Sequence, residues 1–202
     1  MLSPRVLVVL GALAGCAAPS TGTPGEAGGA SAERNAAVLR SARAMLATGD
    51  CREAEPKIVD RPFRMNDPLL PGSMRQTVLV EGCGRRGLLN FAIVPVPAGG
   101  ERVAPMFPGT TITEPTLQRD GLRQAMVAAR AVAPDCGRIT VNETRFEGPA
   151  GSASRGGKAA RPWSETWVLG ACGRLVAVPM EFAPDDRGTT IRVDARAVRP
   201  LN

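Results

Sequence analysis

Residues 78–85 read Val-Leu-Val-Glu-Gly-Cys-Gly-Arg, and residues 167–174 read Trp-Val-Leu-Gly-Ala-Cys-Gly-Arg. In both stretches apolar residues recur at alternate positions before a Cys-Gly-Arg sequence, which is typical of a β-strand that ends in a turn. Farther upstream, Asp50-Cys51 and Asp135-Cys136 correspond in the same way. The sequence therefore repeats, with an offset of 85 residues at the first cysteine of each unit and 89 at the second.

Each unit opens with a helix pattern and continues with strand patterns. Helical spacing of apolar residues predicts helices at 33–47, capped by Ser31, and at 117–133, capped by Thr116. Alternation predicts four strands in each unit, at 57–64, 74–82, 89–93 and 102–106, and at 139–146, 163–171, 176–182 and 189–193. The sequence thus predicts an α+β fold, built by internal duplication of a helix plus an antiparallel β-meander.

The predicted organisation is repeat unit 1 at 32–106, a linker at 107–116 and repeat unit 2 at 117–202. A single unit of this size is marginally stable in isolation. We therefore expect the two units to pack together around a pseudo-twofold axis. Two separate units joined only by the linker are the alternative.

Four cysteines lie within the repeat units: Cys51, Cys83, Cys136 and Cys172. The repeat favours one disulfide in each unit, Cys51–Cys83 and Cys136–Cys172, although a pairing exchanged between the units also respects it. Zinc sites made of four thiolates use closely spaced cysteine pairs, which this sequence lacks. We expect no metal and no cofactor.

The composition excludes several classes of enzyme. The chain has 202 residues, a net charge of +6 and no histidine, which rules out histidine-based acid/base catalysis and histidine-ligated metals. Its positive charge is mostly arginine, since Lys57 and Lys158 are the two lysines. The charge predicts either attraction to anionic polymers and headgroups or a solvated surface. No aromatic and basic platform for nucleic acid is evident.

The first residues carry a targeting pattern. Arg5 precedes an apolar run at Val6–Ala14, which is far shorter than the roughly 20 residues of a membrane-spanning helix. The run ends in Leu13-Ala14-Gly15-Cys16, which resembles the lipobox of bacterial lipoprotein signal peptides. The resemblance implies removal of residues 1–15, acylation of Cys16 and a palmitate-type membrane anchor. An ordinary secretory signal with an incidental cysteine is the alternative.

The resemblance also implies a location. Ala17 rather than Asp follows the cysteine, which in Gram-negative lipoproteins favours the outer membrane, with the protein facing the periplasm. Residues 16–31, rich in Gly, Pro, Ser and Thr, predict the lipidated cysteine and a flexible tether.

Two features are candidates for ligand contact. The Gly-rich segment 148–162 carries three cations, and it is either an anion-binding loop or a disordered insertion. The two tryptophans flank Glu165 on one strand face, where they line a groove or fill the core. The candidate ligand-contact residues are Arg155, Lys158, Arg161, Trp163 and Trp167.

These features favour a membrane-anchored periplasmic lipoprotein that is not an enzyme but a binding or envelope-assembly module. Its expected partners are the bilayer, through acylated Cys16, and an envelope protein that adds to an exposed sheet edge or an anionic cell-wall polymer. The alternative is an envelope hydrolase that uses paired carboxylates, or a serine with Lys57 or Lys158.

Overall fold

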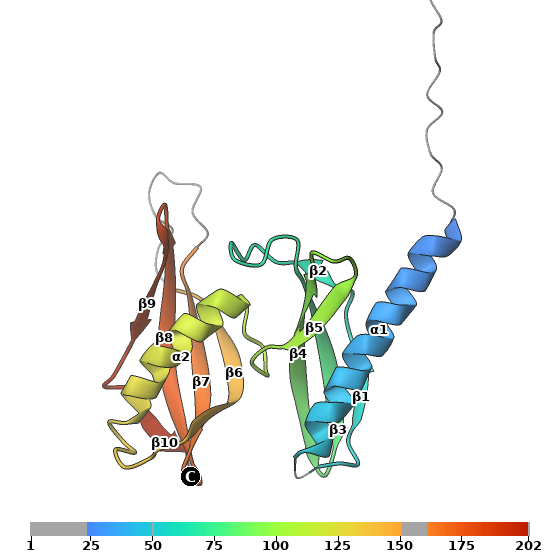
Figure 1. Ribbon diagram of the computed structural model, residues 1–202. Coiled ribbons are helices and arrows are strands. Elements are labelled where there is room, and N and C mark those ends of the chain that lie inside the picture. Colours follow the sequence, from blue (N-terminus) through green and yellow to red (C-terminus); the bar gives the residue numbers. More distant parts are fainter. Residues whose placement is uncertain (1–23, 50, 151–160, 202) are drawn as a thin grey trace, which may run out of the picture.

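The computed structural model describes residues 24–49, 51–150 and 161–201 (Figure 1). Within these residues the chain forms two helices and two antiparallel sheets of five strands each. The fold is therefore mixed α+β with sheet predominating. The expected signal peptide 1–15, Cys16, Arg155 and Lys158 lie outside the described residues.

The first half of the chain builds one helix and one sheet. The order in the sheet is β1-β3-β4-β5, and β2 also pairs with β3. One face of this sheet is covered by the helix, where Val38 and Ala42 are fully buried against Val78, Phe91 and Ile93. The elements are α1 (Pro24–Ala47), β1 (Glu55–Ile58), β2 (Phe63–Arg64), β3 (Met74–Gly82), β4 (Arg85–Pro95) and β5 (Glu101–Pro105).

The second half builds another helix and another sheet. Its strand order is β10-β8-β7-β6, and β9 also pairs with β8. The elements are α2 (Pro115–Ala129), β6 (Ile139–Pro149), β7 (Trp163–Ala171), β8 (Arg174–Asp185), β9 (Gly188–Val193) and β10 (Arg199–Leu201). Figure 1 shows each helix lying along a sheet of its own half.

The Cys-Gly pairs form equivalent tight turns in the two sheets. Cys83 and Cys172 have φ values of 49° and 50°, and the glycine after each also has a positive φ. Two consecutive residues with positive φ define the type I′ turn, which joins antiparallel strands with a two-residue loop. Gly82 therefore pairs with Arg85 across the turn, and the same geometry closes β7 onto β8.

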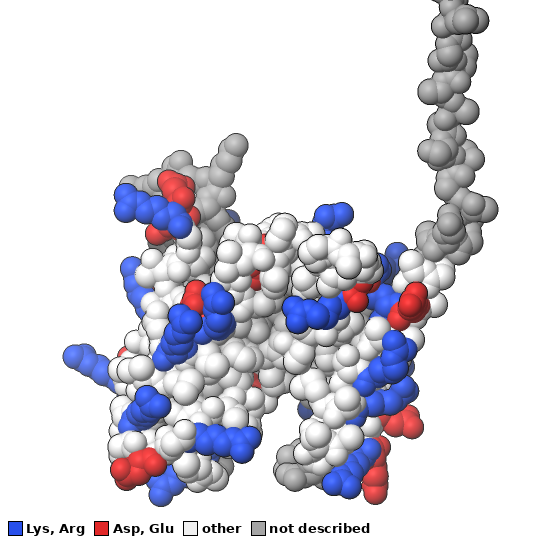
Figure 2. Space-filling view, viewed as in Figure 1, with Lys and Arg blue, Asp and Glu red and all other residues white. Residues whose placement is uncertain are grey.

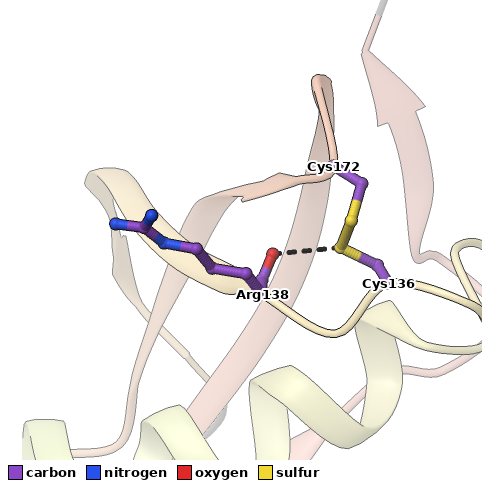
Figure 3. Close-up of a disulfide and its surroundings, with 3 residues drawn as sticks. All are labelled: Cys136, Arg138 and Cys172. Carbon is purple, nitrogen blue, oxygen red and sulfur yellow. Dashed lines mark hydrogen bonds between the residues drawn. A yellow bond between two sulfur atoms is a disulfide. The ribbon is translucent and has the colours of Figure 1, made fainter.

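Each turn is connected by a disulfide to the segment that follows a helix. Cys51 bonds Cys83, and Cys136 bonds Cys172, which confirms the pairing within each unit. The Cys136 sulfur lies 3.0 Å from the carbonyl oxygen of Arg138 (Figure 3). Because a disulfide sulfur has no proton to donate, this is a close S···O contact. On the chain-entropy model a crosslink of this loop length stabilises by roughly 3–4 kcal/mol.

Several element boundaries differ from the sequence prediction. α1 begins at Pro24 and not after Ser31, because proline suits a first helical turn and the following segment contains no other proline. Part of the predicted tether, from residue 24 to 31, is therefore helical. α2 begins at Pro115 with Glu114 at the N-cap position, so the prediction of Thr116 as its cap is wrong; proline suits the first helical position. α2 ends at Ala129, and the chain to Ala133 continues in turns.

The prediction of the strands from the sequence is also wrong in two places. The predicted strand 57–64 is two strands, β1 and β2, which both pair with β3 and are separated by a loop. β10 was not predicted, because a strand of three residues that contains Pro200 has no alternating pattern to detect.

Candidate functional site

The linker between the two halves hydrogen bonds to both sheets. On the first sheet, Met106 N–H donates to the Asn90 carbonyl and Gly109 N–H to the Leu88 carbonyl, each at 2.8 Å. On the second sheet, Thr144 of β6 donates to Pro108 at 2.8 Å, and its carbonyl accepts from Thr110 at 2.7 Å. This region, residues 106–110 with their partners on β4 and β6, is called the junction below.

Two residues explain why the junction is tight. The buried Asn90 amide donates to the carbonyls of Phe107 and Gly109, at 2.8 and 2.9 Å. Gly109 has a φ of 102°, and a Cβ there would lie 2.0 Å from the Thr144 carbonyl oxygen. Only glycine adopts this positive φ without strain and also allows the two backbones to lie so close together. The junction thus fixes the edge of β4 beside β6.

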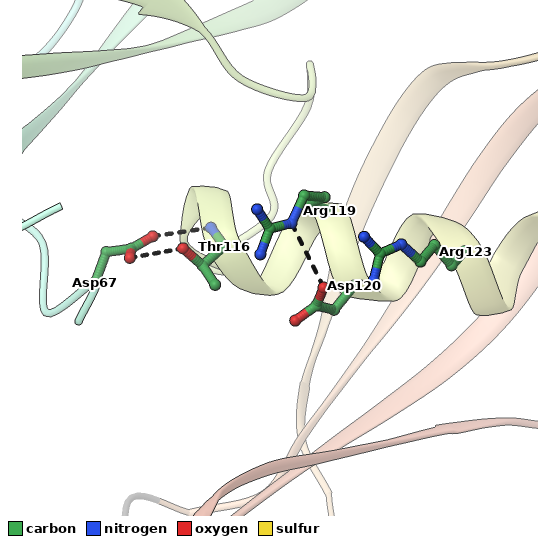
Figure 4. A network of polar contacts seen from close by, with 5 residues as sticks. All are labelled: Asp67, Thr116, Arg119, Asp120 and Arg123. Atoms are coloured by element: carbon green, nitrogen blue, oxygen red, sulfur yellow. Dashed lines mark hydrogen bonds and ion pairs between the residues drawn. The ribbon is translucent and has the colours of Figure 1, made fainter. Parts of the chain in front are cut away.

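The start of α2 is a second connection between the halves. Asp67, in the loop between β2 and β3, accepts hydrogen bonds from the Thr116 backbone N–H at 2.8 Å and from its hydroxyl at 2.7 Å (Figure 4). The side chain of Glu114 accepts a hydrogen bond from the Asn66 backbone N–H. Burial raises the pKa of Glu114, the Asn66 N–H lowers it, and the nearby charge of Asp67 raises it.

A groove of about 550 Å³ lies beside the junction and is lined by both halves of the chain. Figure 2 shows the surface hollowed between the lower ends of the two halves. The lining is mainly apolar, which is the usual character of a binding groove. Its main apolar residues are Leu46, Val80 and Leu88 from the first half, and Val168, Leu175 and Leu201 from the second.

The charged residues of the groove give it an excess of positive charge. They are Arg86, Glu143 and Arg145. Arg145 binds Glu143 at 2.6 Å, and this contact raises the pKa of Arg145. Arg86 lies 3.2 Å from Glu81, but both side chains are largely exposed, so solvent screens this pair. The groove therefore combines apolar side chains with Arg145, which is paired within the groove, and Arg86, whose pair with Glu81 is screened by solvent.

Glu165, the carboxylate that lies between the two tryptophans in the sequence, is almost completely buried, with 1% of its surface exposed. It accepts hydrogen bonds from three donors: the Ile112 backbone N–H at 2.9 Å, the Trp163 indole at 3.1 Å and the Trp167 indole at 2.8 Å. Three donors satisfy a carboxylate in an apolar core. The hydrogen bonds of the Glu165 carboxylate are therefore made within the protein itself.

The two tryptophans lie in the core of the second half. Trp167 is fully buried and contacts Phe107 edge-on, with 5.3 Å between ring centroids. Trp163 stacks on Phe182 at 5.2 Å. Of the two interpretations of this pair, core and groove, the structure therefore supports the core. Arg161 is exposed, and Arg155 and Lys158 lie outside the described residues.

Arg75 is a buried cation of the first sheet, with 6% of its surface exposed. Burial lowers its pKa, and the charges of Glu165 and Asp60 partly offset this. Its Nε has no hydrogen-bond partner among the described residues, and its guanidinium lies 5.9 Å from the ring centre of Phe63.

Surface charge is distributed rather than gathered. On the face shown in Figure 2, arginine and lysine side chains are spread over both halves with carboxylates between them. Lys57 is exposed on β1. In the described part of the chain, no group of three or more His, Cys, Asp or Glu residues is arranged to bind a metal. Neither described helix is both long and apolar enough to cross a bilayer.

Sequence reasoning missed the groove residues. Leu88, Leu175 and Leu201 come from three strands and meet only because the junction sets β4 beside the second sheet. The available signal was local: Leu175 directly follows Cys-Gly-Arg on the strand face opposite the buried Val176 and Val178. An apolar residue on the face away from the helix is a hint of a second contact surface.

No family model, curated protein or solved structure matches this chain.

Proposed function

We propose that this chain is a non-enzymatic binding module of the bacterial envelope, and that the groove beside the junction is its binding site. The observation that carries the proposal is the groove itself: about 550 Å³, lined mainly by aliphatic side chains of both halves and by Arg86, Glu143 and Arg145. An exposed apolar groove of this kind costs solubility unless a partner covers it. Two side chains hold the walls of the groove in a fixed arrangement: the Asn90 amide donates to the Phe107 carbonyl at 2.8 Å, and the Gln118 side chain accepts from the Phe107 N–H at 2.9 Å.

The proposed location is the periplasmic face of the outer membrane, with Cys16 acylated. Support comes from Leu13-Ala14-Gly15-Cys16 and from Ala17 after the cysteine. The two disulfides agree with an oxidising compartment such as the periplasm. Palmitate labelling of the wild-type chain and of Cys16→Ser tests the anchor: label is expected in the first and absent in the second. Equal labelling contradicts it.

We also propose that the two halves arose by internal duplication. Each half has a helix, a disulfide from the segment after that helix to a Cys-Gly turn, and an antiparallel sheet. With an offset of 89 residues, β4 aligns with β8, and β5 aligns with β9 in its pairing. This proposal explains why a groove forms between two similar sheets and not within either one.

Among the described residues, no feature favours the hydrolase alternative. Asp67 and Glu114 lie near each other, but both accept hydrogen bonds from backbone groups of the opposite half. A pair of catalytic carboxylates must instead flank the bond that it cleaves. We therefore propose binding and not hydrolysis.

Photo-crosslinking in native envelopes tests the proposal. A photoreactive amino acid at Leu175, which lies in the groove and is 39% exposed, is compared with one at Val127, which is 69% exposed on α2 and does not line the groove. We expect a discrete crosslinked species at Leu175 and none at Val127. Crosslinking that is equal at both positions, or absent at Leu175, contradicts the proposal.

A further inference from the structure

The open edge of β4 is the feature of the groove that points to a particular kind of ligand. In this strand Leu88 and Asn90 direct their carbonyls away from β3 and toward the linker, where Gly109 and Met106 donate to them. Backbone groups of alternate residues point to the same side of a strand. The N–H and C=O of Arg86 therefore also point away from β3.

No described residue pairs with these backbone groups of Arg86. β5 covers β4 from Phe91 to Pro95, and the linker continues along the edge as far as Leu88. Below that point the edge borders the groove, which Arg86, Gly87 and Leu88 line. Arg86 and Gly87 are exposed and line the groove, so the edge is accessible as well as unpaired.

In the second sheet, the equivalent edge of β8 is paired with a further strand. Aligned on the Cys-Gly turns, Arg86–Leu88 corresponds to Leu175–Ala177 of β8. Those residues pair with β10, in the register Leu201–Leu175 and Arg199–Ala177. β9 pairs with β8 from Met180 to Asp185, as β5 pairs with β4 from Phe91 to Pro95. The second sheet thus has a short strand where the first has the groove.

We infer that the β4 edge at Arg86–Leu88 is a strand-addition site, at which an extended segment of a partner protein with alternating apolar and acidic residues pairs antiparallel to β4. Its backbone takes the position on β4 that β10 takes on β8, up to Leu88, whose carbonyl already accepts from the Gly109 N–H. Alternate side chains of an added strand point to opposite faces of the sheet. Its carboxylates lie on the face that carries Arg86, and its apolar side chains lie on the face covered by α1, toward Leu46 and Val80. Backbone hydrogen bonds and alternating side-chain pockets are the usual basis of such recognition.

The inference rests on the proposed function, so its test separates the two. The probe is a short synthetic peptide of alternating valine and glutamate, and its controls are the same peptide with lysine for glutamate and the same peptide N-methylated at alternate residues. Binding to the full mature chain is measured together with amide hydrogen exchange at Arg86 and Leu88. We expect slowed exchange at both amides, and about tenfold weaker binding of each control peptide.

A pair of variants tests the edge within the protein. Arg86→Pro removes the outward N–H, while Arg86→Ala keeps it and removes the same charge; neither change touches the hydrogen bonds between β3 and β4. We expect Arg86→Pro to bind the valine–glutamate peptide about tenfold more weakly than Arg86→Ala. Circular dichroism and the unfolding midpoint establish that both variants are folded.

The outcomes distinguish the failure of each proposal. If the peptide does not bind, or binds without slowing exchange at Arg86, strand addition is overturned. If the two Arg86 variants bind alike, it is also overturned. In either case, a crosslink at Leu175 that persists in native envelopes leaves the groove as a binding site for a ligand of another shape.

Discussion

Asp67 caps the first turn of a helix that belongs to the other half of the chain. Its Oδ2 accepts the backbone N–H of Thr116 at 2.8 Å, and its Oδ1 accepts the Thr116 hydroxyl at 2.7 Å. Glu114, the residue at the N-cap position of α2, makes no capping hydrogen bond with its own side chain. A carboxylate close to a helix N-terminus is also stabilised by the helix dipole. The helix that covers the second sheet therefore depends on a loop of the first half.

Replacement of Asp67 tests this dependence. Asp67→Ala is expected to lower the free energy of unfolding by about 1–2 kcal/mol, as for loss of a capping residue. A double-mutant cycle with Thr116→Val should give a coupling energy of about 1 kcal/mol. Asp120→Ala, which removes only the exposed contacts with Arg119 and Arg123 on the same helix, should change stability by less than about 0.5 kcal/mol. Equal effects of Asp67→Ala and Asp120→Ala contradict the capping role.

Glu114 makes stability depend on pH. Its pKa is raised in the folded state, so the folded protein holds this proton more tightly than the unfolded chain does. Its contribution is therefore fully present below the unfolded pKa of about 4.5 and is lost as the pH rises through the folded pKa. Glu114→Gln keeps an oxygen that accepts from Asn66 but does not titrate.

The prediction is a difference between two pH profiles. As the pH rises from about 4 to about 7, wild type should lose stability relative to Glu114→Gln, measured by urea unfolding at each pH. If the difference between the two proteins is constant across this range, the raised pKa is contradicted.

The three hydrogen bonds that Glu165 accepts predict different losses of stability for two substitutions at this position. Glu165→Ala leaves the buried indole N–H of Trp167 and the partly buried indole N–H of Trp163 without an acceptor, and should lower the free energy of unfolding by at least about 3 kcal/mol. Glu165→Gln retains one acceptor but brings N–H groups toward other donors, so we expect a smaller loss of about 1–2 kcal/mol. Chemical denaturation, followed by the fluorescence of Trp163 and Trp167, measures both. Equal losses in the two variants are not compatible with these hydrogen bonds.

Substitution of Gly121 by alanine has two opposing effects, a gain in helix propensity and a loss of packing. Alanine is favoured over glycine within a helix by up to about 1 kcal/mol. A Cβ at Gly121, however, would lie 2.8 Å from the buried ring of Trp167. We therefore expect Gly121→Ala to destabilise the protein by about 1–3 kcal/mol.

Gly29 of α1 is the matched control, because a Cβ there would meet nothing within 4 Å. Gly29→Ala should be neutral or stabilising in the same thermal unfolding assay. A gain of stability from both substitutions shows that α2 does not pack on Trp167 as described.

The parts of the fold that follow local patterns were predictable. Alternation along 74–82 and 163–171 predicts β3 and β7, and the repeated cysteines predict both disulfides. The extent of α1 was not predictable in this way, because its first turns carry no apolar stripe and are rich in glycine. β10 is too short for any periodicity.

The candidate site was not predictable for a different reason. Leu88, Leu175 and Leu201 have no shared spacing in the sequence, and they meet because Gly109 and Thr144 bring the β4 edge beside the second sheet. Tryptophans are conspicuous in a sequence with 3% aromatic residues, yet Trp167 is fully buried. The rare tryptophans therefore identified residues of the core, whereas the proposed binding groove is lined by leucines, which nothing in the composition distinguishes.

Whether the groove is the binding site is tested most directly by blocking it while crosslinking to a partner is measured from within it. A photoreactive amino acid at Leu201 is placed in chains that also carry Leu88→Asp or Val127→Asp, and crosslinking yields in native envelopes are compared. Because a carboxylate at position 88 makes an apolar wall polar and repels an acidic ligand, we expect at least a tenfold loss of crosslinking with Leu88→Asp and no loss with Val127→Asp. Equal crosslinking yields in the two chains would contradict the claim that the groove is the binding site.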